Sequence, residues 1–401
     1  MDCIILTNYR KGENQMKRDS AILLMLVLLL AAFIVVLLCG GFNDRSDRAE
    51  AINEKAEEII NSIGGDGEDS EQVTPLVYSE AAKALGLEPE DTVMSLEDSN
   101  VSWRELAYWM GMSKNYYEYY YGEITDWDAD LGGMTVSDYV LSDASEMALL
   151  YHAIEVYAKA QGVSVTDKDV EEIEAARQDD IEYYGGEEAY LAALEADGLT
   201  DELYRYMNEV SALYTNTFIK LYGENGELLT DAEVMDEAMY YGYMAAKHIL
   251  LMFPEEATDE DKAEIHEKAQ KLRDEINSAE DKTAKFDELM NEHSEDTGLV
   301  NFPEGYTFMS GDMVAEFENA VLPLDDYGIS EVVESVYGCH IIMRLPLSLD
   351  GLTLDGTTLG ESLRPAAAAD MLDMEISSFI DDCEITYADI YDSLSPKELF
   401  N

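Results

Sequence analysis

The chain has 401 residues, enough for two or three domains that each bury a hydrophobic core. It contains 86 Asp and Glu against 25 Lys and Arg, a formal net charge of -61, while 47% of its residues are hydrophobic. This charge repels polyanions and excludes broad binding of nucleic acid or anionic lipid headgroups, and the apolar fraction excludes disorder throughout. The cysteines have neither metal-ligand spacing nor the density of a disulfide scaffold, so we expect free thiols. They are Cys3, Cys39, Cys339 and Cys383.

An apolar run near the N-terminus predicts a membrane anchor. Residues 1–20 form a polar tail, and residues 21–39 contain an apolar run of about 18 residues, the length needed to cross a bilayer. Basic residues before the run favour a cytoplasmic N-terminus and export of the remainder. Two alternatives stay open. Met16 suits a natural start, and Cys39 suits the modified residue of a lipoprotein, although Leu38 stands where a small residue is expected.

The next two segments predict a spacer and a helical domain. Residues 40–74 hold a charged helix candidate followed by a run of Gly, Asp, Glu and Ser, which is typical of a linker. From residue 75 to 243 the apolar spacing is helical. Ser102 and Glu105 are spaced as a capping box, and a long amphipathic helix is predicted over 136–161.

A cluster of aromatic residues lies in this helical region. Such side chains combine a large contact area with one polar end, so the cluster is a candidate surface for unfolded polypeptides. Packing among helices is the expected role of at least half of them. The cluster comprises Tyr116, Tyr117, Tyr119, Tyr120, Tyr121 and Trp127.

Two short apolar runs further along each carry one histidine. His248 stands in Ala-Lys-His-Ile-Leu-Leu, and His340 stands in Gly-Cys-His-Ile-Ile. Both runs predict strands, and we expect them to be neighbours in one sheet. Cys339 alternates with His340 along its strand, so its side chain is predicted to pack on the opposite face.

Three motifs between these strands carry a resemblance. They are Phe-Asp-Glu-Leu-Met at 286–290, Ser-Glu-Asp at 294–296 and Gly-Asp-Met-Val-Ala-Glu-Phe-Glu-Asn-Ala at 311–320. In this order and spacing they resemble the parvulin family of peptidyl-prolyl isomerases over about a hundred residues. The helix pattern from residue 158 onward is similar to the chaperone region of PrsA/SurA-type foldases.

The resemblance implies an α+β fold. A mostly helical chaperone domain would carry an inserted parvulin-like domain, with a four-stranded antiparallel sheet and surrounding helices, after one transmembrane helix. The candidates for docking the C-terminal segment on the chaperone domain are Ile385, Tyr387, Ile390 and Tyr391. The expected tail, anchor, linker, chaperone domain, parvulin-like domain and C-terminal segment are 1–20, 21–39, 40–74, 75–243, 244–348 and 349–401.

The resemblance also assigns a catalytic group. His248 and His340 match the paired histidines at the parvulin centre. Asp296 matches a position held by Cys or Asp in the family, where a carboxylate can orient the adjacent imidazole. Tyr337 stands where some relatives have a small hydroxyl residue, and it is expected to contribute its hydroxyl or to narrow the site. Whether the histidines act directly or only hold the shape of the pocket stays open.

Three apolar residues are expected to bind the proline. Met313 and Phe317 are four apart on a predicted helix and share one face, and the resemblance makes them the floor of the proline pocket. Phe308 closes the strand expected after Asp296. Ordinary core packing would also explain these residues taken singly, and the loop after Asp296 lacks the Gly-Gly-Asp-Leu-Gly often seen in the family.

The implied reaction is rotation about X–Pro bonds, which faces a barrier of ~18–20 kcal/mol and needs no covalent step, cofactor or metal. We therefore expect a foldase at the outer face of a bacterial plasma membrane, anchored by residues 21–39, acting on unfolded or newly exported polypeptides. A parvulin-fold holdase without catalysis and, less favoured, a membrane-tethered adaptor are the alternatives. No Arg/Lys cluster precedes the pocket, so phosphoserine-proline selectivity is not expected. His152, His266 and His293 are expected to be structural or solvated.

Overall fold

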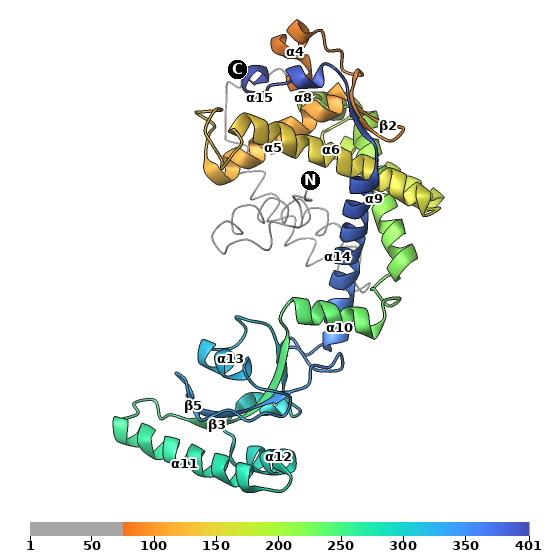
Figure 1. Cartoon of the computed structure of the whole chain (residues 1–401). Coiled ribbons are helices and arrows are strands. Elements are labelled where there is room, and N and C mark those ends of the chain that lie inside the picture. Colours follow the sequence, from red (N-terminus) through yellow and green to blue (C-terminus); the bar gives the residue numbers. More distant parts are fainter. Residues whose placement is uncertain (1–74, 401) are drawn as a thin grey trace. The chain divides into compact units, whose positions relative to one another are not determined.

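The computed structural model describes residues 75–400 (Figure 1), so the expected anchor at 21–39 lies outside the described residues. Within 75–400 every helix is too short or too polar to cross a membrane. The described chain divides into two compact units. One, here called the sheet unit, is Tyr222–Asp370, and the other, the helical unit, joins the described residues before it to those from Met371 onward.

Helices dominate the helical unit. The helix α6 begins with a capping box, in which Thr135 and Asp138 each satisfy the other's backbone N–H. Ser102 accepts the N–H of Glu105 at 3.2 Å, but the Glu105 carboxylate binds His152 at 3.0 Å, so only half of the predicted capping box forms there. The helices are α4 (Glu80–Leu85), α5 (Trp103–Tyr121), α6 (Val136–Ala160), α7 (Asp167–Tyr183), α8 (Glu187–Ala196), α9 (Asp201–Tyr222) and α15 (Pro396–Leu399), with the helix α14 (Leu359–Asp382) containing residues of both units.

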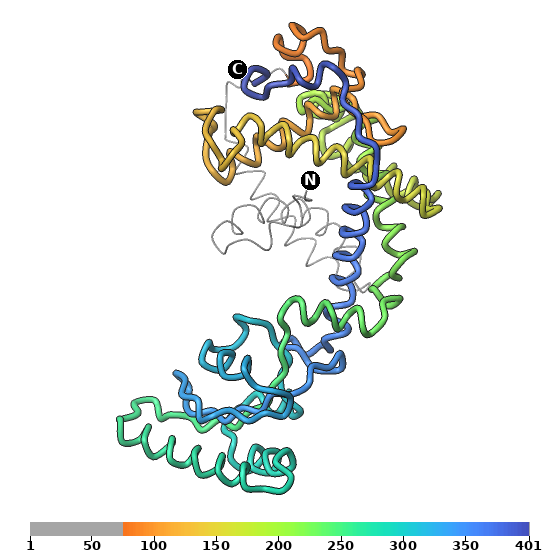
Figure 2. The backbone as a smooth tube through the Cα atoms, viewed as in Figure 1, coloured from red at the N-terminus to blue at the C-terminus, as the bar shows by residue number. Residues whose placement is uncertain are grey.

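A three-stranded sheet in the helical unit corrects the expectation of helices alone over 75–243. Its antiparallel order is β2-β1-β7, formed by Ser99–Ser102, Thr92–Leu96 and Ile385–Tyr387. Figure 2 shows the blue C-terminal segment returning to the orange segment near residue 95. A local pattern does not reveal this sheet, because its third strand comes from almost the other end of the chain. The segment expected to dock is thus a strand, pairing Ile385 with Leu96.

The aromatic cluster is divided between packing and exposure. Tyr119, Tyr120 and Tyr121 are 55%, 43% and 41% exposed at the end of α5. The remaining three are half-buried. Trp127 among them stacks on Phe400 with ring centroids 5.7 Å apart. Half of the cluster therefore packs, as expected, and half faces solvent.

The sheet unit contains the predicted four-stranded antiparallel sheet. Its order is β4-β3-β6-β5, so the two histidine-bearing strands are the central pair. The strands are β3 (Met244–Met252), β4 (Tyr306–Phe308), β5 (Val333–Glu334) and β6 (Gly338–Leu345), and the helices are α10 (Asp231–Tyr240), α11 (Asp259–Ser278), α12 (Lys282–His293) and α13 (Ala315–Val321). The predicted α+β class is confirmed for the described residues.

The two faces of this sheet carry different cores. Side chains alternate along a strand, so Ile249 and Ile341 face one side and His248 and His340 face the other. The first side packs against α11 and α12, and it includes Cys339, which is fully buried as predicted. The second side packs against the segment around α13. The histidines therefore lie on the face opposite α11 and α12.

Candidate active site

Two histidines meet at the centre of the sheet unit. In the β3–β6 register, His340 lies opposite Leu250 and His248 lies opposite Ile342, so the histidines are diagonal neighbours on one face. Their Nδ1 atoms are 3.0 Å apart and their rings stack with centroids 5.2 Å apart. His248 is 8% exposed and His340 is 3% exposed. The prediction of neighbouring strands is confirmed, and the strands place both rings in contact.

Asp296 reaches this pair because the segment after α12 is bonded to the strand β3. The N–H of Glu295 donates to the carbonyl of Leu250 at 2.8 Å, and the N–H of Leu250 donates to Ser294 Oγ at 3.0 Å. These bonds place Asp296 Oδ2 2.9 Å from His248 Nε2. The carboxylate is therefore positioned by a backbone contact formed two residues from the histidine.

Hydrogen bonding defines a chain through four side chains. An ionised carboxylate only accepts, so His248 donates through Nε2 to Asp296, and Nδ1 of the neutral ring is then an acceptor. His340 donates to that atom through its own Nδ1, and its Nε2 accepts from Ser335 Oγ at 2.7 Å. Every ring nitrogen has a partner in this arrangement with both imidazoles neutral.

Electrostatics favour an ionised Asp296 and a neutral His340. Burial acts to raise the pKa of Asp296, but hydrogen bonds from His248, the Tyr306 hydroxyl and the Gly298 N–H outweigh it and lower the pKa to about 2. Burial, reinforced by the nearby His248, lowers the pKa of His340 to about 4 although Asp296 opposes this. At neutral pH the carboxylate is therefore ionised and His340 is neutral.

Apolar rings cover the histidine pair. The Phe317 ring lies 5.2 Å from that of His248 and 5.8 Å from that of His340, nearly perpendicular to both. Phe308 lies 5.8 Å from Phe317, and half-buried Met313 packs against the same cluster. The three residues expected to bind proline are thus brought together beside the histidines. Phe308 and Phe317 are 1% and 2% exposed, so these apolar side chains and the polar chain form one buried cluster.

Tyr337 does not join this group. Its side chain is 56% exposed, and it contributes its backbone N–H, which donates to Ser335 Oγ at 3.1 Å. The hydroxyl beside His340 belongs to Ser335, which is buried at the end of the short strand β5. Sequence reasoning missed Ser335 because only the geometry of the turn before β6 decides which hydroxyl faces inward.

Two further residues of the site were also missed. The Tyr306 hydroxyl donates at 2.6 Å to Asp296 Oδ2, the same oxygen that accepts from His248, so it helps to fix the carboxylate. Glu318 is buried, and its Oε1 accepts the N–H groups of Gly311 and Met313 at 2.8 and 2.9 Å. It thereby holds the loop that presents Met313. Tyr306 follows a positive-φ glycine, a signal for a strand start but not for this contact.

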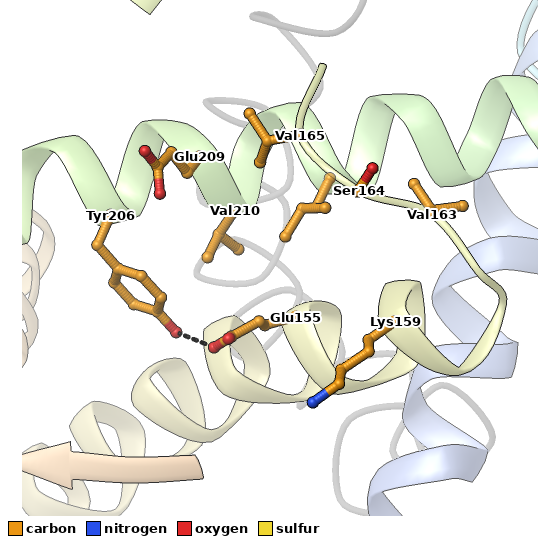
Figure 3. A pocket seen from close by; sticks show the side chains of 9 residues that line it. Glu155, Lys159, Val163, Ser164, Val165, Tyr206, Glu209 and Val210 are labelled. Carbon is orange, nitrogen blue, oxygen red and sulfur yellow. Dashed lines mark hydrogen bonds between the residues drawn. The ribbon is translucent and has the colours of Figure 1, made fainter. Parts of the chain in front are cut away.

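A separate pocket of about 260 Å³ lies in the helical unit (Figure 3). It is bounded by α6, α9 and the extended segment 163–165. Tyr206 donates to Glu155 at 3.2 Å, and Ser99, bonded to Glu155 at 3.3 Å, is also 2.6 Å from Nδ1 of His152. His152 is 4% exposed and structural, as expected. Among residues 75–400, His, Cys, Asp and Glu nowhere form a group of three or more able to hold a metal.

A family model matches within the sheet unit, and a curated relative matches part of the chain. Residues 248–345 match the family described as "Rotamase: PPIC-type PPIASE domain". Foldase protein PrsA of Staphylococcus aureus is 30% identical over 185 residues, which cover 44% of this chain and 52% of that protein. The chain therefore spans about half the length of the curated relatives it matches.

Solved structures described as an isomerase and as chaperones also match parts of the chain. Peptidylprolyl isomerase (PrsA) from Bacillus cereus is 19% identical, with coverage of 78% of this chain and 100% of that chain and a TM-score of 0.30. A chain from the Campylobacter jejuni pair PEB4 and periplasmic Cj1289, described as SurA-like chaperones, is 19% identical, covers 65% and 99%, and has a TM-score of 0.21.

Proposed function

Because residues 248–345 form a PPIC-type parvulin domain, we propose that this chain is a membrane-anchored extracytoplasmic foldase that isomerises X–Pro bonds in exported proteins. The observation that carries the proposal is the hydrogen-bonded chain from Asp296 through His248 to His340, directly beside Phe317. In this proposal residues 21–39 are the anchor, the helical unit is the chaperone part, and unfolded exported polypeptides are the clients.

The chemistry requires only a site that favours the twisted amide over the planar one. Rotation removes the amide resonance and much of the carbonyl dipole, so a surface that excludes water from the carbonyl lowers the barrier. Phe317, Met313 and Phe308 supply that apolar surface and hold the proline ring. His340, kept neutral by burial, places no positive charge against it.

The polar chain has a positioning role in this mechanism. Asp296 sets the tautomer of His248, and His248 and Ser335 together set the orientation of His340. The two stacked imidazoles form a rigid support for the Phe317 ring. Rigid support matters because groups that are already in place stabilise the twisted amide more than the planar one. Groups that move to suit each state would stabilise both alike.

A holdase that binds clients without isomerising them is the second candidate. Two observations favour it. The loop after Asp296 departs from the family pattern and leaves Val300 87% exposed at its end. In addition, Tyr119, Tyr120 and Tyr121 expose aromatic surface on α5, a plausible contact for unfolded chains.

Exchange NMR on a prolyl peptide distinguishes the two functions. The full chain in a nonionic detergent is expected to accelerate cis–trans exchange, and Phe317→Ala is expected to abolish the acceleration. Phe317→Leu is the control for folding, because it keeps an apolar side chain in the core and should retain part of the rate. His248→Ala then measures how much of the rate depends on the polar chain.

Suppression of client aggregation is measured in parallel. Lack of acceleration by the native chain, with aggregation still suppressed, would favour the holdase. In that case the combined variant Tyr119→Ser, Tyr120→Ser and Tyr121→Ser is expected to lose suppression, since it removes the exposed aromatic area.

A further inference from the structure

The basic residues of the sheet unit gather on one side of its sheet. The helices α11 and α12 cover the face opposite the histidines (Figure 1). Lys247 alternates with His248, so it faces that same side, where it pairs with Asp287 of α12. The basic residues of α11 and α12 are Lys262, Lys268, Lys271, Arg273, Lys282 and Lys285.

The segments on the histidine face contain few basic residues. From residue 294 to 343, a stretch that includes β4, α13 and β5, the sequence contains no Lys or Arg. Arg344 follows on β6, but its Nη1 donates to the carbonyls of Leu322 and Leu324 at 3.1 and 3.0 Å. The Arg344 guanidinium therefore binds the carbonyls at the C-terminal end of α13. The face that meets a substrate has little positive charge to offset its carboxylates.

Two of these carboxylates are next in sequence to residues of the proposed proline site. Asp312 precedes Met313 and Glu316 precedes Phe317, and both acidic side chains are exposed. The N–H of Met309 donates to Asp312 Oδ2 at 2.7 Å, which holds the carboxylate in place. Glu318 differs from them, because it is buried and its carboxylate accepts a backbone N–H of the same loop. Asp312 and Glu316 therefore present negative charge to solvent on the segment that also carries Met313 and Phe317.

We propose that the site prefers prolyl segments with Lys or Arg next to the proline and disfavours Asp, Glu or a phosphorylated residue there. This inference rests on the proposed isomerase function and names its substrate class. A cation beside a bound proline would lie near Asp312 and Glu316, and Arg344, the basic residue of β6 on that face, is bonded to the carbonyls at the end of α13, whereas an anion would be repelled. Each exposed pair contributes little, so the expected preference for Lys over Glu, which adds attraction of one to repulsion of the other, is about tenfold.

Three peptides that differ only in the residue before proline test the proposal. With the full chain in nonionic detergent, exchange NMR should give a kcat/KM about tenfold higher for the Lys peptide than for the Glu peptide at low salt, with the Leu peptide between them. At 1 M salt the ratio should approach one, because the Debye length falls to about 3 Å. Equal rates at low salt would overturn the preference while leaving the isomerase intact, and no acceleration of any peptide would instead count against the proposed function.

Variants that remove charge test whether Asp312 and Glu316 cause the preference. Asp312→Asn combined with Glu316→Gln should reduce the Lys-to-Glu ratio to about threefold or less. Glu264→Gln is the matched control for Glu316→Gln alone, since it removes one carboxylate charge from an exposed position on α11, on the far side of the sheet, and should leave the ratio unchanged. Glu316→Gln alone provides a milder variant if the pair unfolds. An unchanged ratio in folded Asp312→Asn/Glu316→Gln protein would refute the assignment.

Discussion

Gly298 lies directly against the hydroxyl of Tyr306. A methyl group at Gly298 would overlap that oxygen, which donates to Asp296 at 2.6 Å. The position of the carboxylate beside His248 therefore depends on the absence of a side chain in the loop that follows it. Gly298 itself donates its N–H to Asp296 Oδ1 at 2.9 Å, so one residue both makes room for the tyrosine and binds the carboxylate.

Gly298→Ala is expected to displace the Tyr306 hydroxyl and raise the pKa of Asp296, because one of the bonds that lower it is lost. Tyr306→Phe removes the same bond without added volume and should raise that pKa in the same direction. Carboxyl ¹³C NMR titration of Asp296 measures both. If Gly298→Ala leaves the titration unchanged while Tyr306→Phe shifts it, the steric argument is wrong.

Acid should destabilise the sheet unit in two separate pH windows. The pKa of His340 is lowered from 6.5 to about 4, so the unfolded chain takes up this proton first and stability falls as pH drops from 6.5 to 4. The pKa of Asp296 is lowered from 3.8 to about 2, so its contribution is present above pH 3.8 and is lost toward pH 2. That contribution is about 2 kcal/mol.

Urea unfolding of the native chain and of two variants at a series of pH values tests these windows. Many other carboxylates titrate in this acidic chain, so the informative quantity is the difference between native protein and variant. The difference for His340→Gln should change between pH 6.5 and 4, and that for Asp296→Asn should change below pH 4. A flat difference in its window would contradict the corresponding assignment.

Ser335→Ala should weaken both the fold and the activity. The variant leaves Nε2 of buried His340 without its partner at 2.7 Å, which costs about 1–3 kcal/mol of unfolding free energy. We expect a several-fold loss of kcat/KM as the ring loses its orientation. Ser278→Ala is the control, because the Ser278 hydroxyl is exposed and bonds only its own helix at Asp274. Equal stability of the two variants would show that the Ser335 bond contributes nothing.

Gly111→Ala should stabilise the helical unit. Gly111 lies inside α5, and a Cβ added there would meet no other atom within 4 Å. Replacing a mid-helix glycine by alanine gains about 0.5–1 kcal/mol, mainly through the lower entropy of the unfolded chain. Thermal unfolding followed by circular dichroism should show a higher midpoint, with prolyl isomerisation unchanged. A lower midpoint would mean that α5 has a backbone that alanine does not fit.

The resemblance to the parvulin family assigned the candidate site, and the pattern of residues predicted the local structure that carries it. His248 and His340 stand in short apolar runs of strand type, and Met313 and Phe317 have the four-residue spacing that places side chains on one helix face. Alternation along the strand also predicted that Cys339 would face away from the histidines, and it is buried on that opposite side. Each of these inferences rests on the regular alternation or spacing of side-chain directions that a strand or a helix imposes on residues close in sequence.

Contacts between distant segments depended on the tertiary structure. The choice of Ser335 over Tyr337 beside His340 follows from the turn before β6, and the bond from Tyr306 to Asp296 follows from the space left by Gly298. Likewise, the strand β7 pairs with β1, although the two strands are far apart in the sequence. Sequence periodicity determines which face of its own element a side chain occupies, but only packing determines which element lies against that face.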